Sequence, residues 1–363
     1  MRRLRLAGLF LASALLFFPT QAGAAKPQAK KVRETAKPIW TLAMDGPWVA
    51  YASGSKIRVW NVATGKTSVV TGHYAGASST ANVIATQIAI AGDRVAWIKD
   101  QQFGNTEEGE KLYTAPVGGK ARLIDHVYRH GVDDPNLTTG GWIEGLAGSG
   151  KTITVSTWKS NGATAIAATL NLVTSKGLSA LAGGPDAIVS ESVDGGRIAV
   201  LHASPWAMFN SVSIYSRNAS TPLAELDLGP SAEGTTGIKV ALDGNRLIVL
   251  TTALHEPDGP ATVTLQVYDW TTGHLLHTWP VGIQKYPGVV SFAVHGQLAA
   301  VEGYGSLHLV SLTTGKDVVF GPSSHGSPPA MDSRGLVYAV NAHLKGPSKL
   351  VFVPTAKLAA AVS

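Results

Sequence analysis

The chain has 363 residues, of which 45% are hydrophobic and only 15% are charged, with 40 glycines and no cysteine. The lack of cysteine excludes disulfides, so we expect packing to stabilise the fold. The net charge of +6 does not indicate a nucleic-acid-binding surface, because eight of the 30 basic residues precede Pro38, leaving 22 basic against 23 acidic residues.

The first 24 residues have the features of a secretory signal peptide. A basic start at residues 2–5 precedes an apolar run at 6–18 and a small-residue cleavage site at 22–24. The apolar run is too short to span a bilayer, and no later segment resembles a transmembrane helix. We therefore expect a secreted or extracytoplasmic protein. Residues 25–38 are expected to form a flexible polar tail, or alternatively to hold a short strand from Val32 that pairs with the closing unit of the fold.

From residue 39 onward, short alternating apolar runs joined by glycine turns recur along the chain. The stretch 240–282 shows the pattern most clearly, with VALDGNRLIVL followed by VTLQVYDWTTGHLLHTWPVG. Four such runs predict one four-stranded antiparallel sheet. Comparable units begin near residues 39, 84, 142, 187, 240, 289 and 328. In the last unit, the segment KLVFVPTAKLAAAV is expected to supply the final two strands.

The turn after the first strand of each unit defines the repeat. These turns are Asp45-Gly46, Ala91-Gly92, Ala147-Gly148, Asp194-Gly195, Asp243-Gly244, His295-Gly296 and Asp332-Ser333. They are spaced by 37 to 56 residues, and a period in the forties to fifties is typical of the blades of a β-propeller. The sequence thus predicts one all-β domain over 39–363, a seven-bladed β-propeller of four-stranded antiparallel blades. Six or eight blades are the alternatives if the third or seventh unit is misassigned.

The pairing of AMDG with IRVWNVATG, and of ALDG with LQVYDWTTG, resembles the WD40-like and TolB-like β-propeller repeat family, here of a secreted bacterial type. The resemblance covers residues 39–363 and implies the fold rather than a function, because these families bind very different partners. It is incomplete, since Trp60-Asn61 stands where Trp-Asp is usual. The stretch TTGHLLHTW also resembles quinoprotein-type repeats, but it occurs once with its tryptophan, so we expect no cofactor.

Residues 145–152, GLAGSGKT, match the phosphate-binding P-loop pattern in full. That loop needs a helix behind it, so that backbone N–H groups and the helix N-terminus face the phosphates. Here an alternating β-branched run, ITVSTW, follows Thr152. We therefore interpret the motif as a glycine-rich hairpin turn.

Two connections in each unit are short and two vary in length. In a four-stranded blade the variable ones, between the second and third strands and between successive units, emerge on the same side of the disc. Function concentrates in such loops. We expect ligand contacts from histidine, acidic and aromatic residues in or beside them: His126, His130, Asp133, Asp134, Trp206, Phe209, His255 and Tyr304.

These residues leave three functions open. The first is a non-enzymatic binding or scaffolding protein, monomeric, that binds a protein or peptide partner on the loop-rich face. The second is a propeller hydrolase or lyase with a metal held by loop His and Asp residues, for which the best candidates are His126, His130, Asp133 and Asp134 in one loop between units. No HxH or HExxH spacing supports it. The third is a quinone- or sugar-binding propeller, which predicts stacked aromatic rings in the channel. We favour the first because no catalytic motif is assembled.

Overall fold

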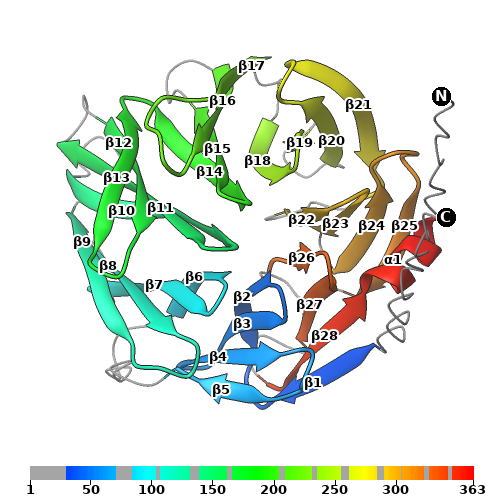
Figure 1. Cartoon of the computed structure of the whole chain (residues 1–363), viewed down its shortest axis with the longest axis horizontal. Helices are drawn as coiled ribbons and strands as arrows, with labels where there is room; N and C mark the ends of the chain where they lie inside the picture. The colour runs from blue at the N-terminus through cyan, green and yellow to red at the C-terminus, as the bar shows by residue number, and fades with distance from the viewer. Residues whose placement is uncertain are drawn as a thin grey trace, which may run out of the picture.

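The computed structural model describes residues 30–70, 84–103, 107–130, 139–161, 166–203, 209–230, 235–254, 261–283, 290–303, 305–322, 327–341 and 346–363. Their strands form seven four-stranded antiparallel blades arranged around a central axis (Figure 1). The prediction of a seven-bladed all-β propeller is therefore confirmed. Among the residues described, no helix is long and apolar enough to cross a membrane.

The first four blades follow the chain in order, from the innermost strand outward. Blade one contains β2 (Ile39–Asp45), β3 (Trp48–Ser53), β4 (Lys56–Asn61) and β5 (Thr67–Val69). Blade two contains β6 (Ile84–Ala91), β7 (Arg94–Phe103), β8 (Glu107–Pro116) and β9 (Arg122–His130). Blade three contains β10 (Thr139–Ser149), β11 (Thr152–Asn161), β12 (Ile166–Val173) and β13 (Leu178–Gly184). Blade four contains β14 (Ala187–Asp194), β15 (Arg197–Ala203), β16 (Phe209–Ser216) and β17 (Ala224–Pro230).

The remaining blades continue this order until the last one. Blade five contains β18 (Thr235–Asp243), β19 (Arg246–Leu254), β20 (Ala261–Asp269) and β21 (His274–Val281). Blade six contains β22 (Ser291–His295), β23 (Leu298–Gly303), β24 (Ser306–Ser311) and β25 (Asp317–Pro322). Blade seven takes β26 (Ala330–Asp332), β27 (Gly335–Asn341) and β28 (Ser348–Pro354) from the end of the chain and β1 (Lys31–Thr35) from its beginning.

The ring is closed by the N-terminal strand. All five residues of β1 pair antiparallel with β28, from Lys31 opposite Phe352 to Thr35 opposite Ser348. In Figure 1 the blue β1 lies along the outer edge of the red β28. The expectation of a flexible tail over 25–38 is thus wrong for residues 31–35, where the alternative of a pairing strand holds. The reason is that β28 would otherwise present an unpaired edge.

The end of the chain departs from the prediction of a fourth strand. Residues Thr355–Val362 form helix α1, which begins directly after Pro354. The sequence TAKLAAAV is rich in alanine, the residue with the highest helix propensity. Leu358 and Val362, four residues apart, are buried against blades six and seven. Because β1 already occupies the outer edge of blade seven, the alanine-rich segment is free to become a helix.

Neighbouring blades pack through alternating aliphatic side chains. Between blades five and six, for example, Val263, Leu265 and Val267 of β20 contact Ala299 and Val301 of β23 within one buried cluster. The innermost strand β18 has one edge on which the described part of the chain places no strand, and side chains of the preceding blade compensate. The Ser190 and Ser192 hydroxyls of β14 accept hydrogen bonds from backbone N–H groups of β18, at 3.2 and 2.9 Å.

The turn residues that mark the repeat also connect blades. Asp194 accepts a hydrogen bond from the Gly244 N–H at 2.7 Å, and Asp45 accepts one from the Gly92 N–H at 2.6 Å. Asp45 also reaches the Gly150 N–H of blade three at 3.2 Å, past blade two, whose turn has Ala91 in place of an aspartate. The Asp-Gly pairs thus form hairpin turns, and their aspartates also form hydrogen bonds between blades.

Removing one of these bonds gives a first test of that role. We expect Asp194→Ala to lower the free energy of unfolding by about 1–2 kcal/mol, because the Gly244 N–H loses a charged acceptor. Urea denaturation measures the change. The exposed Asp93→Ala, in the equivalent turn of blade two, serves as the control. Equal losses in both variants would contradict the bridging role.

The P-loop-like segment is a β-hairpin. Residues 145–149 belong to β10, Gly150 has φ of +63°, and β11 begins at Thr152 with no helix behind Lys151. The interpretation as a turn is confirmed, although the turn lies at Gly150-Lys151 rather than at Ala147-Gly148. Gly145 lies within the strand, where the absence of a side chain lets Glu191 pack closely. A Cβ there would lie 2.9 Å from a carboxyl oxygen of Glu191.

Candidate functional site

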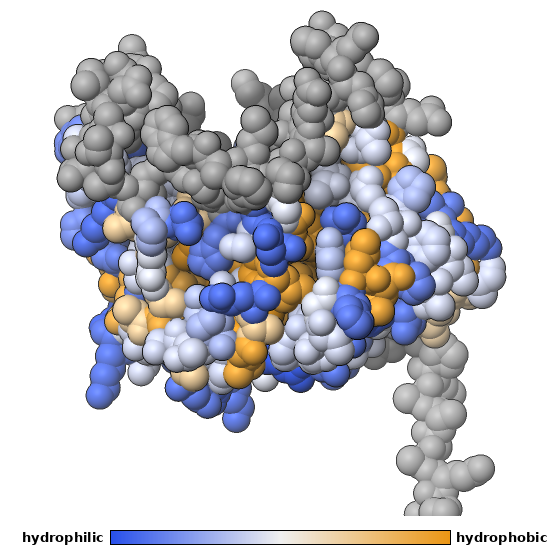
Figure 2. Space-filling model, turned by 90° about the horizontal axis from the view of Figure 1, so that it is seen from above, coloured by the Kyte–Doolittle hydropathy of each residue, from blue (hydrophilic) through white to orange (hydrophobic). Residues whose placement is uncertain are grey.

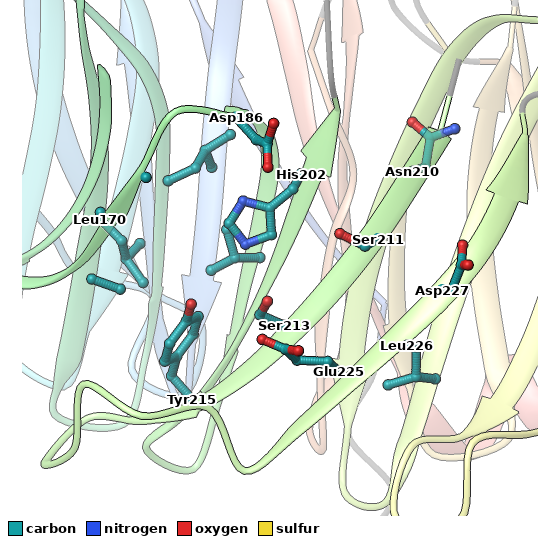
Figure 3. A pocket seen from close by; sticks show the side chains of 15 residues that line it. Leu170, Asp186, His202, Asn210, Ser211, Ser213, Tyr215, Glu225, Leu226 and Asp227 are labelled. Carbon is teal, nitrogen blue, oxygen red and sulfur yellow. The ribbon is translucent and has the colours of Figure 1, made fainter. Parts of the chain in front are cut away.

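A cavity of about 590 Å³ lies between blades three and four (Figure 3). Its walls come from β12 and β13 of blade three and from all four strands of blade four. Several lining residues lie at the end of blade four where the variable connections leave: Ile188 near the start of β14, His202 near the end of β15, and Asn210 and Asp227 on β16 and β17. These residues lie toward the face where the sequence predicts binding, whereas Tyr215 and Glu225 extend the lining toward the opposite end of the blade.

Strand register explains why this cavity is polar. In blade four, Ile188, His202, Ser211 and Asp227 stand opposite one another across the four strands, so their side chains share the face turned toward blade three. Deeper on the same face, Ile198 and Tyr215 pack with Leu170 of blade three in an apolar cluster. On the same face, the polar side chains of His202, Ser211 and Asp227 lie nearer the loop-rich side than this apolar cluster does.

Two glycines of blade three create the space. Strand β13 ends in Gly183-Gly184, which line the cavity without side chains. A Cβ built on Gly184 would meet no atom within 4 Å. The cavity exists because blade three presents bare backbone where blade four presents polar side chains.

The cavity has an acidic rim and an uncharged polar floor. Asp186, Glu225 and Asp227 are exposed carboxylates, whereas Ser213 and Tyr215 are buried beneath them. Among the described residues that line it, none is lysine or arginine. The arrangement therefore favours a ligand group that is positively charged and can donate hydrogen bonds.

His202 lies at the centre of this arrangement. Figure 3 shows its ring between Asp186 on one side and Ser213 and Glu225 on the other. Burial lowers the pKa of His202 below 6.5, and the two carboxylates oppose that shift only in part. The ring is neutral at physiological pH, so it offers one donor and one acceptor and adds no positive charge.

The predicted apolar loop is connected to this cavity along the chain. Trp206 lies outside the described residues, and of Phe209 the structure describes only the backbone, as the first residue of β16. Both belong to the connection between His202 and Asn210, which line the cavity. His255, Tyr304, Asp133 and Asp134 also lie outside the described residues.

The sequence predicts His126 and His130 in a loop between blades, and the structure contradicts this prediction. Both are exposed residues of β9, which continues to His130 and pairs there with β8. Strand β9 also pairs with β10 at His130 and Arg129, which joins blades two and three into one sheet. The strands extend because alternating residues in 122–130 sustain pairing beyond the predicted boundary. The His126 and Tyr128 rings meet edge to face, with centroids 5.5 Å apart.

The joined edge of blades two and three carries a partly buried charged network. Arg129 forms an ion pair with Glu108 and lies 5.8 Å from the centre of the Trp142 ring. Glu110 accepts a hydrogen bond from the Ile143 N–H, yet burial raises its pKa to about 7. In the described ranges, no group of three or more His, Asp or Glu residues could hold a metal ion.

A second cavity, of about 460 Å³, lies along the central axis, lined by innermost strands. It includes Gln87, Glu144, Glu191 and Lys239. Burial lowers the pKa of Lys239, while Glu302 opposes that shift. The stacked aromatic rings that a quinone- or sugar-binding channel would need have no counterpart among the described lining residues.

Sequence reasoning missed the residues of the interblade cavity. Asp186, Glu225 and Asp227 lie within or beside predicted strands, where an acidic residue ordinarily indicates only a solvent-facing position. The available signal was Gly183-Gly184 at the end of a predicted strand, followed by Asp186, because glycine in a strand often marks a close approach or an opening.

Of three solved structures that resemble this chain, hydrazine synthase supports the propeller fold. No family model matches the sequence, and no curated protein matches it. Hydrazine synthase from Kuenenia stuttgartiensis is similar in structure, with a TM-score of 0.57 and 12% identity over 88% of this chain and 96% of that chain. Hsv2 from Kluyveromyces lactis has a TM-score of 0.48, 11% identity and coverage of 83% and 90%. TolB from Acinetobacter baumannii has a TM-score of 0.38, 14% identity and coverage of 69% and 56%. These neighbours are β-propeller proteins, and at such low identity the likeness concerns the fold alone.

Proposed function

We propose that the protein is an exported binding propeller, related to WD40-like and TolB-like repeats, that recognises a basic segment of a protein or peptide partner on its loop-rich face. The observation that carries the proposal is the cavity between blades three and four, with three carboxylates and no cationic residue in its described lining. A lysine or arginine side chain of the partner would enter it.

The chemistry of the walls matches such a side chain. The methylene stem of lysine or arginine would contact Ile188 and Val200, and its charged end would face Asp186 and Glu225. The neutral His202 ring supplies an acceptor without opposing the incoming charge. Trp206, four residues after His202 in the sequence, is of the residue type that interfaces commonly use beside a charged anchor.

The structure offers a variant that narrows the cavity without removing a polar group. We expect Gly184→Leu to occupy part of it and to weaken binding of a short lysine- and arginine-containing peptide at least tenfold, because the new side chain enters space that no atom occupies within 4 Å of its Cβ. Glu225→Gln should weaken binding about threefold, the effect of one exposed charge. Isothermal titration calorimetry measures both changes, and circular dichroism confirms that each variant is folded.

A matched control separates this site from general electrostatics. Asp93→Asn removes an exposed carboxylate from the turn between β6 and β7, away from the cavity, and should leave peptide affinity unchanged. A peptide with glutamine in place of its basic residues should not bind. Unchanged affinity in Gly184→Leu would overturn the proposal. The competing metal-dependent hydrolase or lyase would instead require a stoichiometric metal in the purified protein, which elemental analysis detects.

A further inference from the structure

A third cavity, of about 360 Å³, lies where the closing strand meets the first blade. One wall comes from β1 and the residues that follow it, and the other from β3, β4 and the turn between them. Four basic side chains line it: Arg33, Lys37, Lys56 and Arg58. Segments that are adjacent only because the ring is closed therefore bring four positive charges together.

The backbone arrangement holds these side chains at the seam. In β1, Arg33 and Thr35 lie on the more buried side of the strand, whereas Val32 and Glu34 face solvent. Arg58 stands opposite Tyr51 in the register of β3 and β4, so these two side chains share one face of blade one. The bend after β1 is fixed because the Thr35 and Ser53 hydroxyls both donate hydrogen bonds to the Lys37 carbonyl, at 2.7 and 3.2 Å.

The charges in this cavity are unbalanced. Glu34 is the one acidic residue among its lining, and its side chain is 75% exposed and pairs with Lys349 at 3.7 Å, on the neighbouring strand β28. Within the described part of the chain, none of the four basic side chains makes an ion pair or hydrogen bond. Four like charges at one cavity repel one another unless an anion joins them.

A buried donor independently indicates a ligand. Tyr51 is 0% exposed and lines the cavity, and its hydroxyl has no hydrogen-bond partner. A buried hydroxyl that makes no hydrogen bond destabilises a fold. An acceptor oxygen in the cavity would bond to this hydroxyl and to the guanidinium groups of Arg33 and Arg58 at once.

We propose that this cavity binds a phosphate-type oxyanion. The guanidinium groups of Arg33 and Arg58 match the geometry of a tetrahedral oxyanion, Lys37 and Lys56 add charge, and the Tyr51 hydroxyl donates the neutral hydrogen bond. Because β1 supplies one wall and blade one the other, the bound anion holds the closing strand in place. The oxyanion is either free in solution or the headgroup of an anionic lipid, and the two sources are separable by experiment.

Titration with inorganic phosphate at constant ionic strength tests the site. We expect saturable binding of one phosphate per protein, with chloride as the reference, and slower amide hydrogen exchange in Lys31–Thr35 when phosphate is bound. Arg58→Gln should weaken binding at least tenfold. Tyr51→Phe, which keeps the aromatic packing, should weaken it about threefold. Arg217→Gln, an exposed arginine of blade four's outer hairpin, is the control and should bind normally.

Vesicles distinguish the sources of the oxyanion. Binding to phosphatidylglycerol vesicles but not to phosphatidylcholine vesicles, lost in Arg58→Gln, identifies a lipid headgroup as a ligand of the site. Phosphate binding without vesicle binding identifies the free anion. The proposal is overturned if neither probe binds, or if Arg58→Gln and Tyr51→Phe bind both probes as the unmodified protein does.

Discussion

Deleting residues 1–36 should lower the free energy of unfolding on the order of 3 kcal/mol or more, at about 1 kcal/mol for each lost backbone hydrogen bond. The deletion removes β1, all five residues of which pair with β28. It also removes the Lys31 ammonium group, which donates to the carbonyls of Val62 and Ala63 in blade one. Thermal unfolding followed by circular dichroism measures the loss, and the exposed edge of β28 should promote association at high concentration.

Deleting only residues 1–29 is the matched control, because it leaves β1 complete. That variant should unfold at the same temperature as the longer chain. If both deletions have the same effect, β1 does not close the ring in solution. Asn341 would then be the main link between the chain ends, since its side chain bonds to both the N–H and the carbonyl of Ile39, at 3.2 and 2.9 Å.

Replacing Glu191 with glutamine should stabilise the protein at alkaline pH. Both carboxyl oxygens of Glu191 are buried, and one of them lies close to Gly145 of blade three. Burial raises the pKa of this carboxyl to about 8, although Thr154 and Ser156 favour its charged form. The folded protein therefore holds a proton that the unfolded chain releases above its ordinary pKa of 4.5.

This linkage fixes the sign of the pH dependence. Since the folded state binds the extra proton, stability decreases as pH rises between 4.5 and about 8, by about 1.4 kcal/mol per pH unit for this group. At pH 8, Glu191→Gln should be more stable than the unmodified protein on the order of 4 kcal/mol. At pH 4.5 the two should be nearly equal. Urea denaturation at both values measures this, and equal stability of the two proteins at pH 8 would contradict the prediction.

The fold was predictable because each blade is specified by local patterns. Alternating apolar runs and the turns at Asp45-Gly46, Asp194-Gly195 and Asp243-Gly244 mark hairpins that need no distant information. The closure of the ring was harder to predict from the sequence. The pairing of Lys31–Thr35 with β28 joins the two ends of the chain, and KVRET has only a weak apolar alternation. The helix at Thr355–Val362 follows from that closure, which leaves no edge for another strand to occupy.

The sequence predicts on which face of the disc the candidate site lies, but it does not predict the residues of the site. Long connections indicated the side of the disc, and part of the lining of the cavity between blades three and four lies there. Its residues depend on the register of four strands, which places His202 beside Ser211 and Asp227. A one-residue shift would turn all three toward blade five. Sequence patterns of separate strands do not contain that relation, so histidines expected in loops, such as His130, were selected instead.

The rim of the disc shows how outer strands differ from inner ones. Seen from the side, apolar residues lie scattered among charged ones (Figure 2). Val319 of β25 and Leu275 of β21 are 71% and 49% exposed, whereas the middle strand β23 is buried throughout. The propeller thus buries its middle strands most deeply and leaves single apolar side chains at its edge, as folded proteins commonly do.

The pairing of Lys31–Thr35 with β28 has a consequence for biosynthesis. A ribosome makes β1 first and makes β28, with which β1 pairs in the described part of the chain, nearly last, so six blades can form before β1 is paired. Blade seven forms by pairing segments that are more than three hundred residues apart in the sequence. Its assembly is therefore slow relative to the formation of local hairpins. A chain that ends before β28 would consequently leave β1 unpaired and blade seven incomplete.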